Sequence, residues 1–179
     1  MYSNLQRLGF VGSTALTAVF ALLAAVSFTG DMGLPADGTL PVDLRVVKSE
    51  LLHGRHDIPE YRGGVRGDYG KIRVDLDADL TPLWNWNTKL VFVDLVVEFA
   101  TPTHPSNAVT IWDTIIYDAE SAHLRLRGIQ NKYALSSHNH KLKEGQSMNL
   151  TLQWNIVPWV GAMRNQRQGG RIEQFLLSA

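Results

Sequence analysis

The sequence has 179 residues, with 17 basic and 17 acidic side chains and no cysteine. A net charge of zero argues against a nucleic-acid-binding protein, because such proteins need a clustered positive surface. The lack of cysteine excludes disulfide scaffolds, thiolate metal sites and cysteine nucleophiles, while the apolar fraction of 45% is ordinary for a folded domain.

An apolar segment near the N-terminus is the first expected element. No ionisable side chain lies between Arg7 and Asp31, and residues 8–29 would form a helix about 33 Å long at about 1.5 Å per residue. A hydrocarbon core is about 30 Å thick, so the segment predicts one transmembrane helix. The alternative is a cleaved signal peptide, since Ala25 and Ser27 fit a small-x-small cleavage pattern. The apolar region of a signal peptide usually has only about 7–15 residues, which favours a retained signal-anchor.

The charges that flank this segment predict its orientation. Arg7 precedes it, whereas Asp31 and Asp37 follow it. The positive-inside rule then places residues 1–7 in the cytosol and the rest of the chain across the membrane. Residues 30–40 are rich in glycine, proline and aspartate and are expected to form a linker.

Period-two alternation marks the strands of the remaining body, residues 41–179. In residues 71–80, apolar side chains alternate strictly with charged ones, as in a half-buried antiparallel strand. Residues 53–70, rich in glycine and charge, are expected to form a long surface loop, and residues 84–87 a turn. These patterns predict an all-β fold, an antiparallel β-sandwich. The expected strands are 42–46, 71–80, 89–100, 108–117, 123–127, 131–135, 147–157 and 171–177.

Three aspartates, Asp75, Asp77 and Asp79, have the spacing that opens a calcium loop. An EF-hand also needs glycine at the sixth and glutamate at the twelfth position, where Leu80 and Trp86 stand. Alternate residues of a strand share a face, so we expect these carboxylates to form a polar strand face.

Two histidines, His138 and His140, could place their imidazoles on one side of a strand, as in some metal sites. The surrounding sequence, Ser-Ser-His-Asn-His, is typical of a polar loop, so solvated loop histidines are expected. We therefore expect no metal and no cofactor.

Hydrolytic catalysis needs a nucleophile, a base and an orienting group. No serine stands in a Gly-x-Ser-x-Gly elbow. The pair Ser147-Met148 superficially resembles the serine box of membrane proteases, but Ser147 opens an alternating strand. We expect no catalytic residues, and an unrecognised hydrolase is the least favoured function.

One N-glycosylation sequon, Asn149-Leu150-Thr151, lies in the expected strand 147–157. Both polar residues of the sequon fall on the polar face of that strand. With the orientation predicted above, this face lies outside the cytosol, so we expect a glycan on Asn149.

The tryptophans fall into two groups. Trp112 and Trp154 lie within apolar strands and are expected in the core. The others lie near strand ends, where core packing and a contact surface are both open, because tryptophan is enriched at interfaces. The candidate partner interface consists of Trp84, Trp86, Asn87 and Trp159.

Four segments resemble a known family in their order and spacing. Residues 78–89 carry Ala-Asp-Leu-x-x-Leu-Trp-x-Trp-Asn-x-Lys, and residues 109–115, 132–133 and 150–158 match further downstream. Together with the N-terminal span, they resemble the signal peptidase complex subunit 3 family, glycosylated accessory subunits of the endoplasmic-reticulum signal peptidase. The loop 54–66 and the tail after Gly161 do not match the family pattern.

The resemblance implies a single-pass protein of the endoplasmic-reticulum membrane with a lumenal β-sandwich. Members of the family have no catalytic residues; they bind the serine-protease subunit and other small membrane subunits and support signal-peptide removal. The other function that remains open is a secreted or membrane-anchored β-sandwich that binds a carbohydrate-type ligand through its tryptophans. Retention of the apolar segment discriminates the two, because a subunit needs its anchor.

Overall fold

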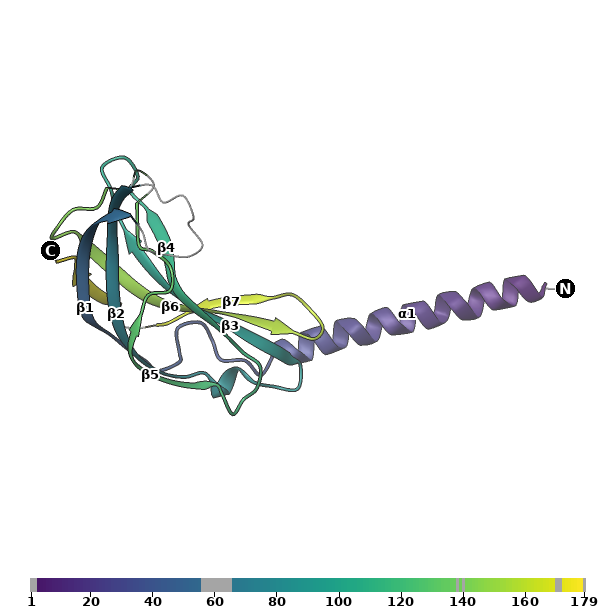
Figure 1. Cartoon of the computed structure of the whole chain (residues 1–179). Coiled ribbons are helices and arrows are strands. Elements are labelled where there is room, and N and C mark those ends of the chain that lie inside the picture. The colour runs from purple at the N-terminus through teal and green to yellow at the C-terminus, as the bar shows by residue number, and fades with distance from the viewer. Residues whose placement is uncertain (1–2, 56–65, 138, 140, 170–171, 179) are drawn as a thin grey trace.

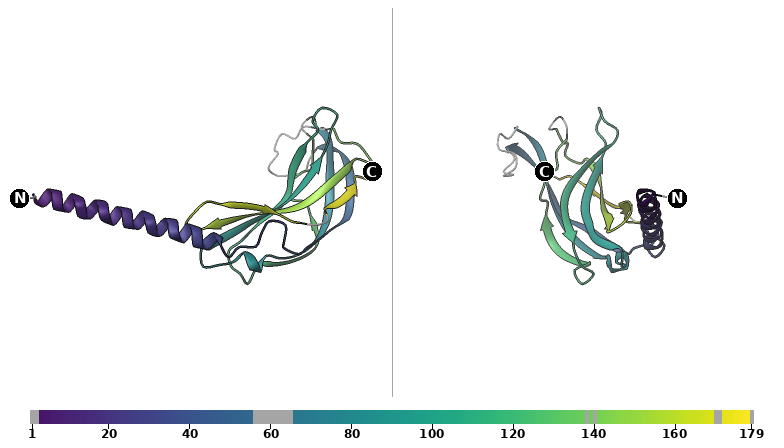
Figure 2. Two further views of the ribbon diagram at one scale, coloured as in Figure 1. Left: turned by 180° about the vertical axis from the view of Figure 1, so that it is seen from behind. Right: turned by 90° about the vertical axis from the view of Figure 1, so that its right-hand side faces the viewer.

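The computed structural model describes residues 3–55, 66–137, 139, 141–169 and 172–178. A long helix projects from one end of a two-sheet β-domain, and the N-terminus lies at the far end of that helix (Figures 1 and 2). Both sheets are antiparallel throughout. The prediction of an all-β fold preceded by one apolar helix is confirmed.

Helix α1 spans Asn4–Asp31 and is longer at both ends than the expected span. A capping box starts it: the Gln6 N–H donates to Ser3 Oγ at 3.3 Å, and the Ser3 N–H donates to Gln6 Oε1 at 3.2 Å. Gly30 is its buried residue, and its large apolar side chains are exposed. By length and composition α1 could cross a membrane, as the sequence predicts.

The three-stranded sheet contains β1 (Val42–Arg55), β2 (Arg66–Asp79) and β5 (His123–Gln130) in the order β1-β2-β5. The alternation of β2 is confirmed, since Ile72, Val74, Leu76 and Ala78 are at most 1% exposed. These side chains form the face of the sheet that packs on the core.

The expected surface loop 53–70 is wrong at both ends. Residues 53–55 belong to β1 and residues 66–70 to β2, where His53 pairs with Asp68 and Gly54 with Gly67. Backbone pairing satisfies the peptide groups of these residues whatever their side chains, so glycine and charge did not prevent a strand. Residues 56–65 lie outside the described residues.

The second sheet contains β4 (Asn107–Ile116), β3 (Thr88–Phe99), β6 (Ser147–Pro158) and β7 (Arg164–Arg167) in that order, and β8 (Glu173–Leu176) also pairs with β6. The 3₁₀ helix η1 (Thr81–Leu83) and a turn at residues 84–87 connect β2 to β3, which confirms the expected turn. The strand expected at 131–135 is wrong, because only Leu135 makes an isolated bridge, to Gly70.

The core lies between the two sheets, and Trp154 of β6 is its largest fully buried side chain. The indole N–H of Trp154 donates to Gln166 Oε1 at 3.0 Å, so the buried polar group is satisfied. Trp112 is only half-buried and packs at the margin of the core, with Lys132 Nζ 5.6 Å from its ring centroid. The core prediction is confirmed for Trp154 and only in part for Trp112.

Candidate functional site

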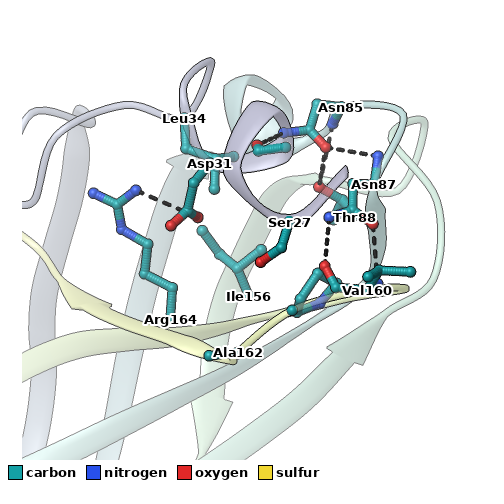
Figure 3. A pocket seen from close by; sticks show the side chains of 13 residues that line it. Ser27, Asp31, Leu34, Asn85, Asn87, Thr88, Ile156, Val160, Ala162 and Arg164 are labelled. Atoms are coloured by element: carbon teal, nitrogen blue, oxygen red, sulfur yellow. Dashed lines mark hydrogen bonds and ion pairs between the residues drawn. The ribbon is translucent and has the colours of Figure 1, made fainter. Parts of the chain in front are cut away.

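The last turn of α1 meets the β-domain beside the turn before β3 and the β6–β7 hairpin (Figure 3). A hollow of about 80 Å³ remains between them. It holds a few water molecules at most, whereas small-molecule sites usually measure about 300–1,000 Å³. The arrangement is therefore a packed joint and not a ligand pocket. Its lining includes Ser27, Asp31, Leu34, Asn87, Ile156 and Arg164.

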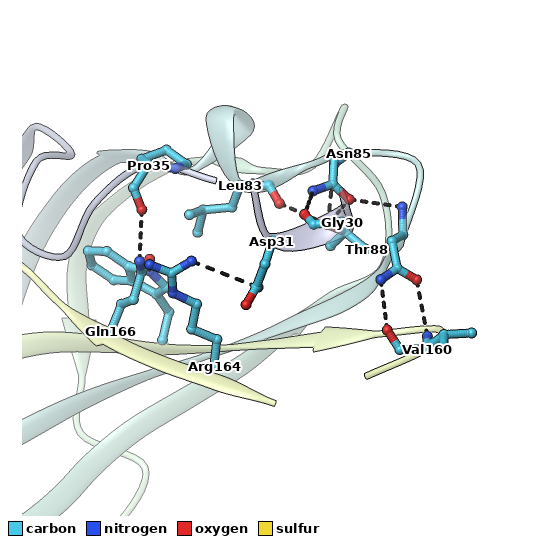
Figure 4. Close-up of polar contacts among 11 residues, drawn as sticks. Gly30, Asp31, Pro35, Leu83, Asn85, Thr88, Val160, Arg164 and Gln166 are labelled. Carbon is cyan, nitrogen blue, oxygen red and sulfur yellow. Dashed lines mark hydrogen bonds and ion pairs between the residues drawn. The ribbon is translucent and has the colours of Figure 1, made fainter. Parts of the chain in front are cut away.

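Gly30 is the point at which the helix touches the domain most closely. Its carbonyl oxygen accepts a 2.6 Å hydrogen bond from Asn85 Nδ2 (Figure 4). A Cβ atom at Gly30 would lie 2.5 Å from Asn87 Nδ2, which is closer than real Cβ contacts come. Glycine is required here because the turn before β3 packs directly on the helix backbone.

Asn87 fixes the turn before β3 to the β6–β7 hairpin. Its Nδ2 donates to Val160 O at 2.8 Å, and its Oδ1 accepts from the Val160 N–H at 3.0 Å. The carbonyl of Asn87 also accepts from the Trp159 N–H at 2.8 Å. Asn87 is 4% exposed, so it lies in the interior and not on the partner-facing surface that was expected for it.

The hairpin also contacts α1 directly. A Cβ atom on Gly161 would lie 2.6 Å from Ser27 Oγ, so the hairpin backbone packs against the helix one turn before its end. Further along the hairpin, Arg164 Nη1 lies 3.8 Å from Asp31 Oδ1. Because both of these charged side chains are partly exposed, this ion pair adds little stability compared with the packing.

The residues after α1 are bound along β7 and do not form a free linker. Gln166 Nε2 donates to Pro35 O at 2.9 Å, and the Arg167 N–H donates to Asp37 Oδ1 at 2.9 Å. Gly38 and Gly169 approach so closely that a Cβ atom on Gly169 would overlap the carbonyl of Gly38. Helix, following segment and β-domain are thus joined at several independent points.

Two of the four candidate interface residues are exposed. Trp86 is 63% and Trp159 67% exposed, and Lys89 Nζ lies 5.3 Å from the ring centroid of Trp159. Trp84 instead is half-buried and packs against the core, and its indole N–H is buried without an acceptor among the described residues. The candidate surface is reduced to Trp86 and Trp159.

The aspartates of β2 point outward and pair with neighbouring groups. Asp77 Oδ1 lies 3.1 Å from His123 Nε2 on β5, and Asp75 Oδ1 accepts from the Gly128 N–H at 2.7 Å. The hydroxyl and N–H of Thr81 lower the pKa of Asp79. Among the described residues, no three His, Cys, Asp or Glu side chains lie close enough together to hold a metal ion. His138 and His140 lie outside the described residues.

The sequon lies in β6 on the outer face of the five-stranded sheet. Asn149 is half-buried between Glu98 of β3 and Gln174 of β8, while Thr151 is 3% exposed. Ser147, at the start of the same strand, pairs with Leu176 of β8 and is exposed. The carbohydrate on Asn149 stays a prediction.

Sequence reasoning missed the joint itself. Gly30 stands in an apolar segment and Gly161 after a strand, and neither position carries a local signal of a close approach. The Asn-rich turn was the available clue, because asparagine side chains often bind the backbone.

A family model described as signal peptidase subunit matches residues 1–177. Signal peptidase complex subunit 3 of Saccharomyces cerevisiae is 39% identical over 168 residues, which are 91% of this chain and 90% of that protein. The Yarrowia lipolytica protein of the same name is 42% identical over 172 residues, 90% of each chain. The Homo sapiens protein of that name is 32% identical over 128 residues, 71% of this chain and 69% of its own. With its apolar helix and two-sheet β-domain, the chain belongs to the signal peptidase subunit family.

Proposed function

We propose that the chain is a non-catalytic subunit of the signal peptidase complex in the endoplasmic-reticulum membrane. In this proposal α1 spans the membrane once, residues 1–7 lie in the cytosol and the β-domain lies in the lumen. The names of the yeast and human relatives support the complex. The exposed apolar surface of α1 and the basic residue before it support the anchor and its direction.

The observation that carries the proposal is the joint between α1 and the β-domain. Asn85 binds the backbone of Gly30, and the hairpin packs on Ser27, so two separate segments of the domain hold the end of the helix. A subunit that supports a membrane protease must hold its domain at a fixed height and angle above the bilayer. A secreted ligand-binding module has no need of such a joint.

Two of the described histidines, His53 and His123, pair with aspartates of β2. His123 Nε2 faces both Asp77 Oδ1 and Arg125 Nε, each at 3.1 Å. His53 Nδ1 lies 2.6 Å from Asp68 Oδ1 at the exposed end of the β1–β2 ladder. In both pairs the histidine contacts charged neighbours and not a serine that it could activate, so we assign it to strand pairing.

Affinity purification tests the proposal. The full chain carries a tag at its C-terminus and is extracted from membranes of its source with a mild detergent. A serine protease of the signal peptidase type and other small membrane subunits should co-purify in constant proportion. Purification of the chain alone from intact membranes, or its recovery as a secreted protein lacking residues 1–27, would contradict the proposal.

A further inference from the structure

Exposed apolar side chains gather at the end of the β-domain that meets α1. Trp86 follows Asn85, whose side chain binds Gly30. Trp159 precedes Val160, which binds Asn87. The next residue, Gly161, packs against Ser27 of the helix. Met163, in the same hairpin, is 69% exposed. The β6–β7 hairpin runs beside the end of α1 in Figures 1 and 2.

The joint fixes the depth of the backbone at these residues relative to α1. A hydrocarbon core about 30 Å thick, centred on residues 8–29, ends near Phe28 at a rise of about 1.5 Å per residue. The headgroup layer adds about 5–7 Å on each side. Ser27 and Gly30, which contact the hairpin and the turn, fall at this boundary.

We propose that Trp86 and Trp159 insert into the headgroup layer of the bilayer that α1 spans. Tryptophan is enriched at this depth, since the ring is apolar and its N–H can bind water or a headgroup. Lys89, with its Nζ 5.3 Å from the Trp159 ring centroid, carries a cation that can reach lipid phosphate from the same place. The inference rests on α1 spanning the membrane, as the proposed function requires.

The geometry favours the bilayer, and not a protein partner, as the surface that covers Trp86 and Trp159. Trp86 adjoins Asn85, and Trp159 lies two residues before Gly161, and these neighbours contact α1 at a depth where lipid surrounds the helix wherever no protein does. Lipid contact therefore needs no further partner. The contact would hold the β-domain against the membrane at points beside α1 and would limit its tilt. A protein partner that covers both rings is the competing outcome of the test.

Quenching by brominated lipid tests the contact. The full chain is reconstituted without other subunits into phosphatidylcholine vesicles whose acyl chains carry bromine near the headgroup. Trp86→Phe and Trp159→Phe should each reduce the quenched part of the tryptophan fluorescence, and the double variant should lose about half or more of it. Trp112→Phe, in β4, is the matched control and should leave the quenched part unchanged.

Flotation of the same vesicles shows whether a negative result concerns the lipid contact of the two tryptophans or the membrane span of α1. A chain that floats and resists alkaline extraction, yet keeps its full quenching in the double variant, would overturn the lipid contact while α1 still spans the membrane. Rings that stay accessible to iodide in these vesicles, and become shielded only within the co-purified assembly, would assign them to a protein partner and also overturn it. A chain that does not float would overturn the proposed function itself.

Discussion

The side-chain amide of Asn85 donates a 2.6 Å hydrogen bond to the carbonyl oxygen of Gly30, across 55 residues of sequence. Gly30 is the buried residue of α1, and Asn85 stands in the turn that leads into the central strand β3. The contact therefore links the end of α1 to the turn that enters β3.

Gly30→Ala should destabilise the chain by about 1–3 kcal/mol, because overpacking at a tight contact forces its neighbours to move. The added Cβ atom would meet Asn87 Nδ2, which is itself held by Val160 and cannot yield without losing that bond. Thermal unfolding of the full chain in detergent micelles measures the change. Gly33→Ala is the control, since nothing lies within 4 Å of its Cβ position. Equal melting temperatures for the two variants would contradict the account of the joint.

Asn87→Ala should cost about 1–3 kcal/mol, because the half-buried N–H and carbonyl of Val160 lose their partner. Trp86→Ala, one residue earlier but exposed, should change stability by no more than about 0.5 kcal/mol. Trp154→Ala in the core should cost about 3–5 kcal/mol. Denaturant unfolding of the three variants measures these losses in the free energy of unfolding. If Trp86→Ala loses as much stability as Trp154→Ala, the Trp86 ring lies in the core.

Some strands and buried residues of this fold could be predicted from the sequence, and others could not. The alternation of β2 and the apolar run of β3 predicted both strands, because burial of one or both faces leaves a local pattern. β7, with the sequence Arg-Asn-Gln-Arg, has no such pattern and was missed. The burial of Asn87 was missed for a similar reason, since its partner Val160 lies 73 residues away and polar residues are mostly exposed.

Asp94→Asn should stabilise the β-domain by about 0.2–1 kcal/mol at neutral pH, as expected for removing like charges across neighbouring strands. Asp94 is 8% exposed and pairs with Asp113 of β4; burial first, and then the charge of Asp113, raise its pKa. A raised pKa in the folded state means that the ionised carboxylate opposes folding, so the penalty disappears as pH falls through that pKa.

Melting temperatures of wild type and Asp94→Asn across a pH series check this sign. The difference should be largest at neutral pH and should shrink toward the ordinary pKa of aspartate. Glu144→Gln, at an exposed position, is the control and should show no such trend. A variant that is less stable than wild type at neutral pH would contradict the unfavourable charge.

Asn149→Gln should remove a glycan from the chain expressed in its source. The sequon lies on the outer face of β6, and the proposed orientation exposes the translocating chain to the glycosylation machinery. The change in gel mobility on glycosidase treatment shows whether the glycan is present. Asn155→Gln, on the same strand and face but outside a sequon, should keep the shift. An unglycosylated wild-type chain would argue against the lumenal placement of the β-domain.

Signal-peptide cleavage, measured across a size separation of the tagged, detergent-extracted material, tests most directly whether this chain is a non-catalytic subunit. Activity is expected only in fractions where this chain elutes with a serine-protease subunit, and none is expected where it elutes alone. Cleavage by fractions that contain this chain alone, abolished by a single serine or histidine substitution in it, would contradict the account.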